Sequence, residues 1–124
     1  MKKRYHVDVY LPDELGEEFL GFIPRKGTRL WLGWHYKNIM EDKELPEYLV
    51  WPCTSSLVDI TTSSGGRIEN VKLRWYVPCK DKDITVMISG NKDVGYTALS
   101  AYWLDKDDVH ASLDVSKYEQ GEMM

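Results

Sequence analysis

Apolar and polar residues alternate along most of this chain, and a period of two is the spacing of side chains along a β-strand. The longest such run covers residues 67–77 and ends before Pro78. One face of this run carries Val71, Leu73, Trp75 and Val77, and the other carries Asn70, Lys72, Arg74 and Tyr76. Because an apolar strand face has to be covered, the pattern predicts a sheet that packs against a core on one side.

Turn residues divide the alternating runs into hairpins. Ser63-Ser64-Gly65-Gly66 separates the run 57–62 from 67–77, and the polar turn 80–83 separates 67–77 from 84–89. Both arrangements predict antiparallel strand pairs. Further elements are expected outside this region: strands at 5–11, 28–36 and 48–51, a surface loop at 38–47, and a short helix at 13–20.

The last third of the chain fits two interpretations. Residues 96–104 suit a strand, and they also suit a helix in which Leu99 and Trp103 lie four apart. The polar turn 105–108 and the strict alternation in 109–115 favour a strand hairpin. A helix beginning at Asp108 is the alternative, so that 94–118 forms either a hairpin or a partly helical segment.

These elements predict a mainly β domain. About seven short strands joined by Gly, Pro, Asp and Ser turns favour a small antiparallel barrel, roll or sandwich with one short helix. An α+β fold with a C-terminal helix is the alternative. The 124 residues suffice for one core, so we expect a single domain over 1–124 with a frayed end at 119–124.

Charge and cysteine content limit the partners and the compartment. The net charge is −4, with 16 Lys and Arg against 20 Asp and Glu, whereas proteins that bind phosphate backbones are usually basic. No run approaches the ~18 apolar residues of a membrane span, so no membrane contact is expected. Cys53 and Cys79 form neither a secreted disulfide framework nor a zinc signature, which predicts thiols in a reducing cytoplasm.

No sequence motif points to catalysis, a metal or a cofactor. Gly65-Gly66 leads into a strand instead of a phosphate-binding helix, and no serine has the glycine pattern of a nucleophile elbow. The histidines His6, His35 and His110 stand apart, without the spacing of zinc hydrolases. Two weaker hypotheses remain open, a hydrolase that uses one histidine with carboxylates and a composite metal site. The metal site would combine Cys53, Cys79, His6 and His35.

Aromatic residues make up 12% of the chain, and they divide between two strand faces. In the expected strands, Trp34 and Trp75 fall in core-facing registers, whereas Trp31 and Tyr76 fall opposite them. If 28–36 and 67–77 share a sheet, the side opposite the core forms a candidate binding face. Its residues are Arg29, Trp31, His35, Lys72, Arg74 and Tyr76.

Trp, Tyr and Arg are the residues enriched at the energetic centres of protein interfaces. The candidate face therefore predicts a non-enzymatic module that binds a protein partner or a second copy of itself. Aromatic rings beside cations also stack on bases and sugars, so binding of single-stranded nucleic acid or carbohydrate is the alternative. A face without function, whose aromatics serve β-propensity or a second core, is the third interpretation.

Overall fold

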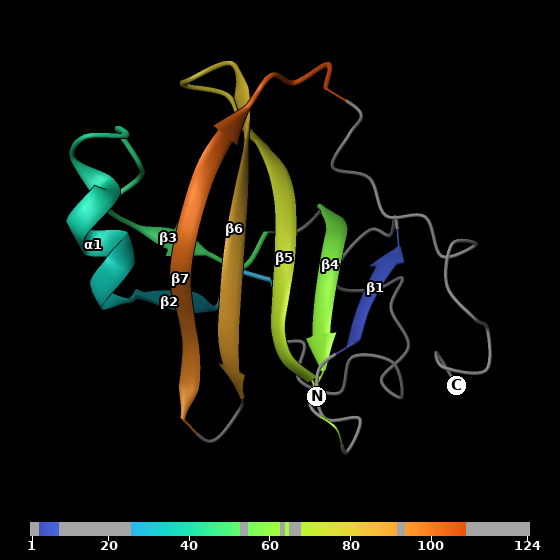
Figure 1. The fold of residues 1–124 in the computed structure, drawn as a ribbon. Coiled ribbons are helices and arrows are strands. Elements are labelled where there is room, and N and C mark those ends of the chain that lie inside the picture. Colours follow the sequence, from blue (N-terminus) through green and yellow to red (C-terminus); the bar gives the residue numbers. More distant parts are fainter. Residues whose placement is uncertain are drawn as a thin grey trace.

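The chain forms a mainly β structure with one short helix in the residues that the computed structural model describes, which are 3–7, 26–52, 55–62, 64, 68–91 and 94–108. The helix is α1 (Trp34–Met40) (Figure 1). The strands are β1 (Lys3–Val7), β2 (Arg29–Leu32), β3 (Leu49–Val50), β4 (Ser56–Thr62), β5 (Ile68–Val77), β6 (Lys82–Asn91) and β7 (Gly95–Leu104). They form one mixed sheet in the order β1-β4-β5-β6-β7-β2-β3, which is not closed into a barrel.

The antiparallel part of the sheet follows the alternating pattern of the sequence. Strands β4 and β5 pair with Ile60 opposite Val71, and β5 and β6 pair with Leu73 opposite Val86, so both predicted hairpins are confirmed. Strand β7 pairs with β6 along its whole length, which confirms a strand at 96–104. The predicted helix at 13–20 and the predicted strand at 109–115 lie outside the described residues.

One strand pair departs from the expected antiparallel sheet. Strand β2 runs parallel to β7, with Trp31 opposite Thr97 and Leu32 opposite Ala98, and it pairs antiparallel with β3 on its other side. Parallel neighbours need a long connection, and here α1 and β3 to β6 all lie between β2 and β7 in the chain. The fold is therefore mainly β, as predicted, but the sheet is mixed and open.

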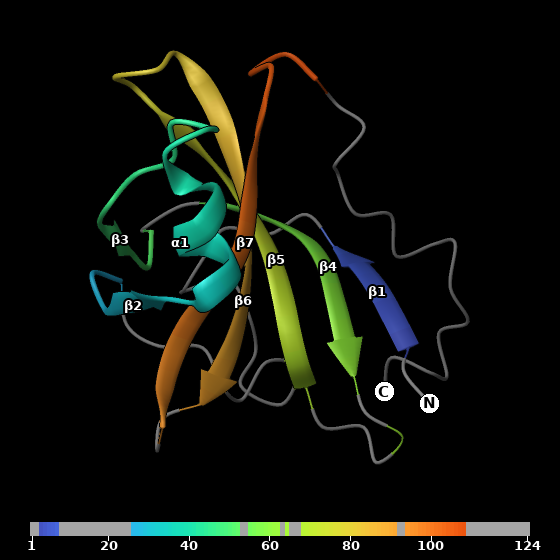
Figure 2. The same ribbon diagram turned by 60° about the vertical axis from the view of Figure 1, so that its left-hand side comes forward.

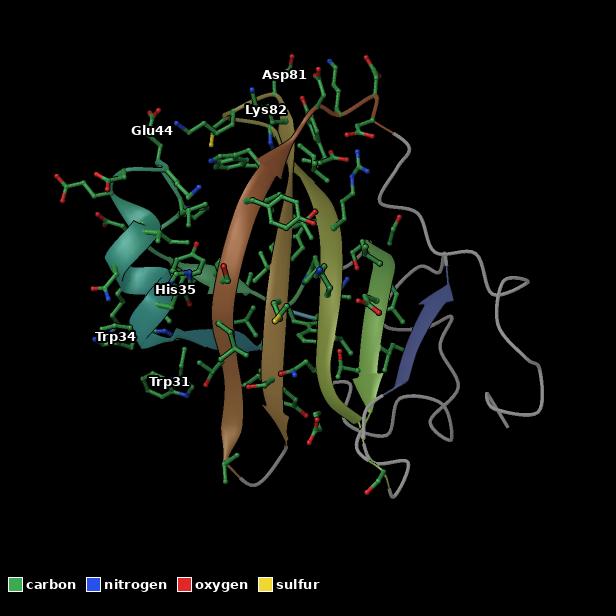
Figure 3. All side chains as sticks on the ribbon, in the orientation of Figure 1. Trp31, Trp34, His35, Glu44, Asp81 and Lys82 are labelled. Atoms are coloured by element: carbon green, nitrogen blue, oxygen red, sulfur yellow. The ribbon has the colours of Figure 1, made fainter. Side chains whose placement is uncertain are left out.

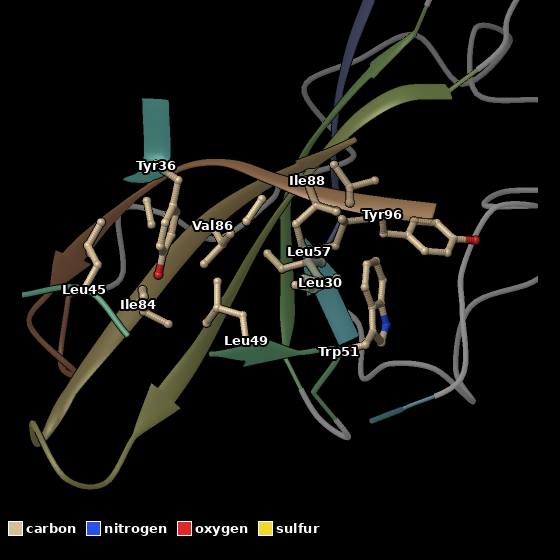
Figure 4. Close-up of a cluster of buried hydrophobic side chains, with 14 of the residues drawn as sticks. Leu30, Tyr36, Leu45, Leu49, Trp51, Leu57, Ile84, Val86, Ile88 and Tyr96 are labelled. Carbon is tan, nitrogen blue, oxygen red and sulfur yellow. The ribbon is translucent and has the colours of Figure 1, made fainter. Parts of the chain in front are cut away.

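The core lies between two layers. Strands β2 and β3 cross behind β6 and β7 at a large angle, and α1 lies beside them (Figures 1 and 2). Leu30, Leu49 and Trp51 from this layer point at Ile84, Val86 and Ile88 of the main sheet (Figure 4). The remaining buried apolar residues of the cluster are Tyr36, Leu45, Leu57, Ile60, Val71, Leu73, Tyr96, Ala98 and Ala101.

The prediction of a strand over 28–36 is wrong beyond Leu32. Gly33 donates its N–H to the carbonyl of Ala98 at 2.8 Å, and helix α1 begins at the next residue. A Cβ at position 33 would lie 3.0 Å from that carbonyl oxygen, which explains the glycine at this close approach. From this residue on, side chains on one face recur with the helical period of 3.6 residues instead of the strand period of two. Trp34 is therefore 80% exposed instead of core-facing.

Tyr36 takes the core position that the sequence pattern assigned to Trp34. Its ring is fully buried, and its hydroxyl donates to the carbonyl of Pro46 at 2.8 Å. Burial raises the pKa of this phenol. Ile39 and Met40, three and four residues further on, pack against the same core, so one face of α1 closes this end of the molecule.

A Schellman motif ends the segment that follows α1. Leu45 donates to the carbonyl of Met40 at 2.9 Å and Glu44 donates to Glu41 at 3.2 Å, while Leu45 and Met40 both pack into the core. Glu44 has a φ of 53°, the left-handed conformation that glycine usually adopts at this position. Its carboxylate also pairs with Lys80 at 3.1 Å on the surface.

This geometry predicts that Glu44→Gly is more stable than Glu44→Ala by about 1 kcal/mol, because only glycine adopts a positive φ without strain. Both variants lose the exposed ion pair with Lys80, so each is the control of the other. Urea denaturation followed by Trp fluorescence measures the difference. Equal free energies of unfolding would show that Glu44 is not held in the left-handed conformation.

Candidate functional site

An arginine lies between two exposed aromatic rings on the solvent side of β2 and β3. Leu30 and Leu49 pair across these strands and enter the core, so their neighbours point away from it. The guanidinium carbon of Arg29 lies 5.7 Å from the ring centre of Trp31 and 5.1 Å from that of Tyr48. Both rings are 60% exposed. Such contacts contribute about 0.5–1 kcal/mol each at exposed sites.

A shallow hollow opens beside this arginine. Its volume is about 180 Å³, which is below the range of pockets that enclose small molecules and suits a single side chain. It is lined by Arg29, Leu30, Trp31, Leu32, Lys37, Glu47 and Tyr48. We call the solvent-facing members, Arg29, Trp31, Lys37, Glu47 and Tyr48, the Arg29 surface.

Gly95 supports the indole of Trp31. A Cβ at position 95 would lie 3.1 Å from Nε1 of Trp31, and the glycine has a φ of +89°. The turn before β7 therefore provides both the conformation and the space that the ring needs. Trp34 projects from the start of α1, and in the view of Figure 3 it lies at the same end of the molecule as Trp31.

The six residues of the predicted binding face do not lie on one surface. Arg29 and Trp31 lie on β2, whereas Lys72, Arg74 and Tyr76 lie on β5, and β6 and β7 stand between these two strands in the sheet. Because β2 crosses the other side of the core, the solvent sides of β2 and β5 point away from each other. His35 lies on α1 instead of a strand, and it is exposed.

Arg74 is held in place by contacts with the neighbouring strand and with the end of β7. Its Nε donates to Asp83 on the neighbouring strand at 2.6 Å, and a terminal nitrogen donates to the carbonyl of Asp105 at 3.0 Å. The residue is only 7% exposed. Its guanidinium joins β5, β6 and the end of β7.

Tyr76 is engaged in a similar way at the turn between β5 and β6. Its hydroxyl donates to Oδ1 of Asp81 at 2.5 Å, and Lys106 donates to the same oxygen at 3.0 Å. The hydrogen bond from Tyr76, followed by the contact with Lys106, lowers the pKa of Asp81. The same hydrogen bond raises the pKa of the Tyr76 phenol. Asp81 lies at the end of the sheet opposite Trp31 (Figure 3).

Three members of the Arg29 surface were missed by the sequence prediction: Lys37, Glu47 and Tyr48. A signal for Tyr48 was available, because it precedes the buried Leu49 in a β-rich run and so points outward. Lys37 lies on α1, directly after the segment expected to be a strand, and Glu47 lies in the segment expected to be a surface loop. Their approach to Arg29 depends on the tertiary fold.

The metal-binding and cysteine chemistry of the described residues is limited to a few observations. They contain no group of three or more His, Cys, Asp and Glu that could hold a metal ion. Cys79 is a free, exposed thiol at the turn after β5, and Cys53 lies outside the described residues. The helix that the structure describes is too short and polar to cross a membrane.

The ion pair of Arg74 predicts that Arg74→Gln lowers the free energy of unfolding by about 3 kcal/mol, since it leaves the largely buried Asp83 without its cation. The matched control is Lys72→Gln on the same strand face, which should stay within about 0.5 kcal/mol of the parent. Chemical denaturation of both variants measures these values. Similar, small losses of stability in the two variants would mean that the ion pair of Arg74 with Asp83 does not stabilise the fold.

The hydrogen bond of Tyr76 predicts that Tyr76→Phe raises the pKa of Asp81 toward its ordinary value. A carboxyl with a lowered pKa stabilises the fold above its unfolded-state pKa, and this contribution is lost as the pH falls through the folded value. The variant should therefore lose less stability on acidification than the parent does. Carbon-13 NMR titration of Asp81 measures the shift, with Tyr102→Phe as the control. An unchanged pKa in Tyr76→Phe would contradict the assignment.

Comparison with protein-family models, with curated proteins and with solved structures finds no match to this chain.

Proposed function

We propose that this domain is a non-enzymatic binding module that recognises another protein through the Arg29 surface. The observation that carries the proposal is the placement of Arg29 between Trp31 and Tyr48, with both rings largely exposed. Trp, Tyr and Arg are enriched at the energetic centres of protein interfaces. Trp and Tyr offer a large contact area at a low cost in conformational entropy, and Arg offers several hydrogen-bond donors. Here all three types meet at one hollow.

The position of this surface in the fold also supports the proposal. Among the described strands, β3 stands last in the order of the sheet and has only two residues, so the surface lies beside an edge strand. Trp34, at the start of α1, is 80% exposed as well.

Binding of single-stranded nucleic acid or carbohydrate is less well supported. That hypothesis needed Trp31, Tyr76 and three cations on one face. Arg74 is instead buried against Asp83, and Tyr76 is bonded to Asp81 at the far end of the sheet. The cations left near Trp31 are Arg29 and Lys37, with Glu47 beside them, which is a short track for a phosphate backbone.

The free thiol at Cys79 and the absence of a secreted cysteine pattern support a reducing compartment as the place of action. We therefore propose that the module works in the cytoplasm. A second copy of the chain is one candidate partner, and the following experiment separates it from a different protein.

Photo-crosslinking tests the proposal directly. A benzoylphenylalanine placed at position 48 of the full chain, in cells of the organism that encodes it, should yield one crosslinked species of discrete mass. Trp31→Ala should reduce this species at least about tenfold, because truncation of a central interface residue costs 2 kcal/mol or more. The control is the same probe at Tyr102, which is 40% exposed on β7.

Each outcome of the crosslinking has a defined meaning. A species of twice the chain mass, matched by a dimer in light scattering, identifies self-association. Crosslinking of equal strength from positions 48 and 102, or none from either, would contradict the proposal. Quenching of Trp fluorescence by an oligonucleotide or oligosaccharide, abolished in Trp31→Ala, would favour the alternative function.

A further inference from the structure

The guanidinium of Arg29 has unused hydrogen-bonding capacity. Its contacts with other described residues are the two ring faces, and no ion pair or hydrogen bond joins its side chain to any of them. An arginine has five N–H donors in a planar arrangement, and ring faces cannot accept hydrogen bonds along its edge. The N–H donors of Arg29 are therefore not used by the other described residues, and a ligand at this exposed side chain can accept hydrogen bonds from them.

A second cation lies at the same hollow. Lys37, from the exposed side of α1, lines it together with Arg29, and likewise forms no ion pair within the described part of the chain. Glu47 is the one carboxylate in the lining, so the hollow carries a net charge of about +1 in a chain of net charge −4. This is a small positive site on an acidic protein.

We infer that the Arg29 surface binds a carboxylate side chain of a protein segment, with an apolar side chain next to it. This inference rests on the proposed function and names the chemistry of the partner. The carboxylate would accept two parallel hydrogen bonds from the edge of Arg29, the geometry in which arginine and carboxylate pair best. Its apolar neighbour would lie on the ring of Trp31 and on Leu32, which is only partly buried.

Charge and size favour a single carboxylate over a phosphate. Glu47 offsets part of the positive charge, which disfavours a group with nearly two negative charges more than one with a single charge. The overall negative charge of the chain also opposes the approach of polyanions. The apolar part of the lining that reaches the surface, Leu32 with the two rings, matches a side chain on a peptide better than a free anion.

NMR titration of the isotope-labelled full chain tests the inference. The probes are a short blocked peptide with one Glu between two Leu, the same peptide with Gln in place of Glu, and inorganic phosphate. We expect the Glu peptide to shift the Nε–H signal of Arg29 and the indole N–H signal of Trp31. The Gln peptide should bind at least about tenfold more weakly, since a charged hydrogen-bond acceptor has been removed.

Matched variants show which side chains are responsible for binding the Glu peptide. Arg29→Gln should abolish the preference for Glu over Gln, and Arg29→Lys should restore only part of it, because lysine keeps the charge without the planar donors. Lys37→Gln should weaken binding of the Glu peptide by about two- to fivefold, as for an exposed ion pair. Lys72→Gln, a cation on the far side of the core, should leave binding unchanged. The amide spectrum of each variant reports whether it is folded.

Failure of the carboxylate inference can be distinguished from failure of the proposed function. Equal shifts by the Glu and Gln peptides would overturn the carboxylate inference and leave the protein-binding function in place. If neither peptide shifts the signals but crosslinking from position 48 is retained, the carboxylate inference is overturned and the protein-binding function remains in place. If neither peptide shifts these signals and no crosslink forms, both proposals fall. Binding of inorganic phosphate more tightly than the Glu peptide would also overturn the choice of a carboxylate.

Discussion

The apolar face of the main sheet has to be removed from water, and the way this chain covers it determines the rest of the structure. Strands β4 to β7 present a row of buried apolar residues on one side, which includes Leu73 and Val86. A sheet with one such face is stable only when a second layer packs on it. In the described residues that layer is formed by β2, β3 and α1, which supply Leu30, Leu49 and Tyr36 to the core.

The covering layer has a solvent side of its own, and the Arg29 surface lies there. Strand side chains alternate, so burial of Leu30 and Leu49 places Arg29, Trp31 and Tyr48 outside. The same packing that closes the core therefore brings an arginine and two rings together across β2 and β3. On the outer face of β5, by contrast, Arg74 and Tyr76 are held by Asp83 and Asp81.

Local pattern was sufficient to predict the antiparallel hairpins, because each depends on alternation and turn residues close together in the chain. The local pattern failed to predict the change from strand to helix at Gly33. The core-facing residues here are Leu32, Tyr36, Ile39 and Met40, which have helical spacing, but the aromatic residues in 31–36 hide this spacing in the sequence. The parallel pairing of β2 with β7 joins residues that are far apart in sequence. Such contacts leave no local signal.

The candidate site was predicted in part for the same reason. Arg29 and Trp31 were placed correctly on the side opposite the core, since that follows from alternation alone. Tyr48 and Lys37 reach them only because β3 and α1 pack beside β2. The grouping with β5 was an assumption about strand order, and β6 and β7 stand between the two strands.

Strands β2 and β3 cover the core with their leucines and carry Arg29, Trp31 and Tyr48 on the other side. A nuclear Overhauser spectrum of the labelled chain tests this arrangement most directly. We expect cross-peaks from the methyl groups of Leu30 and Leu49 to those of β6, and from the Arg29 side chain to the rings of both Trp31 and Tyr48. Cross-peaks from the Trp31 indole to the methyl groups of Val86 or Ile88 would contradict it.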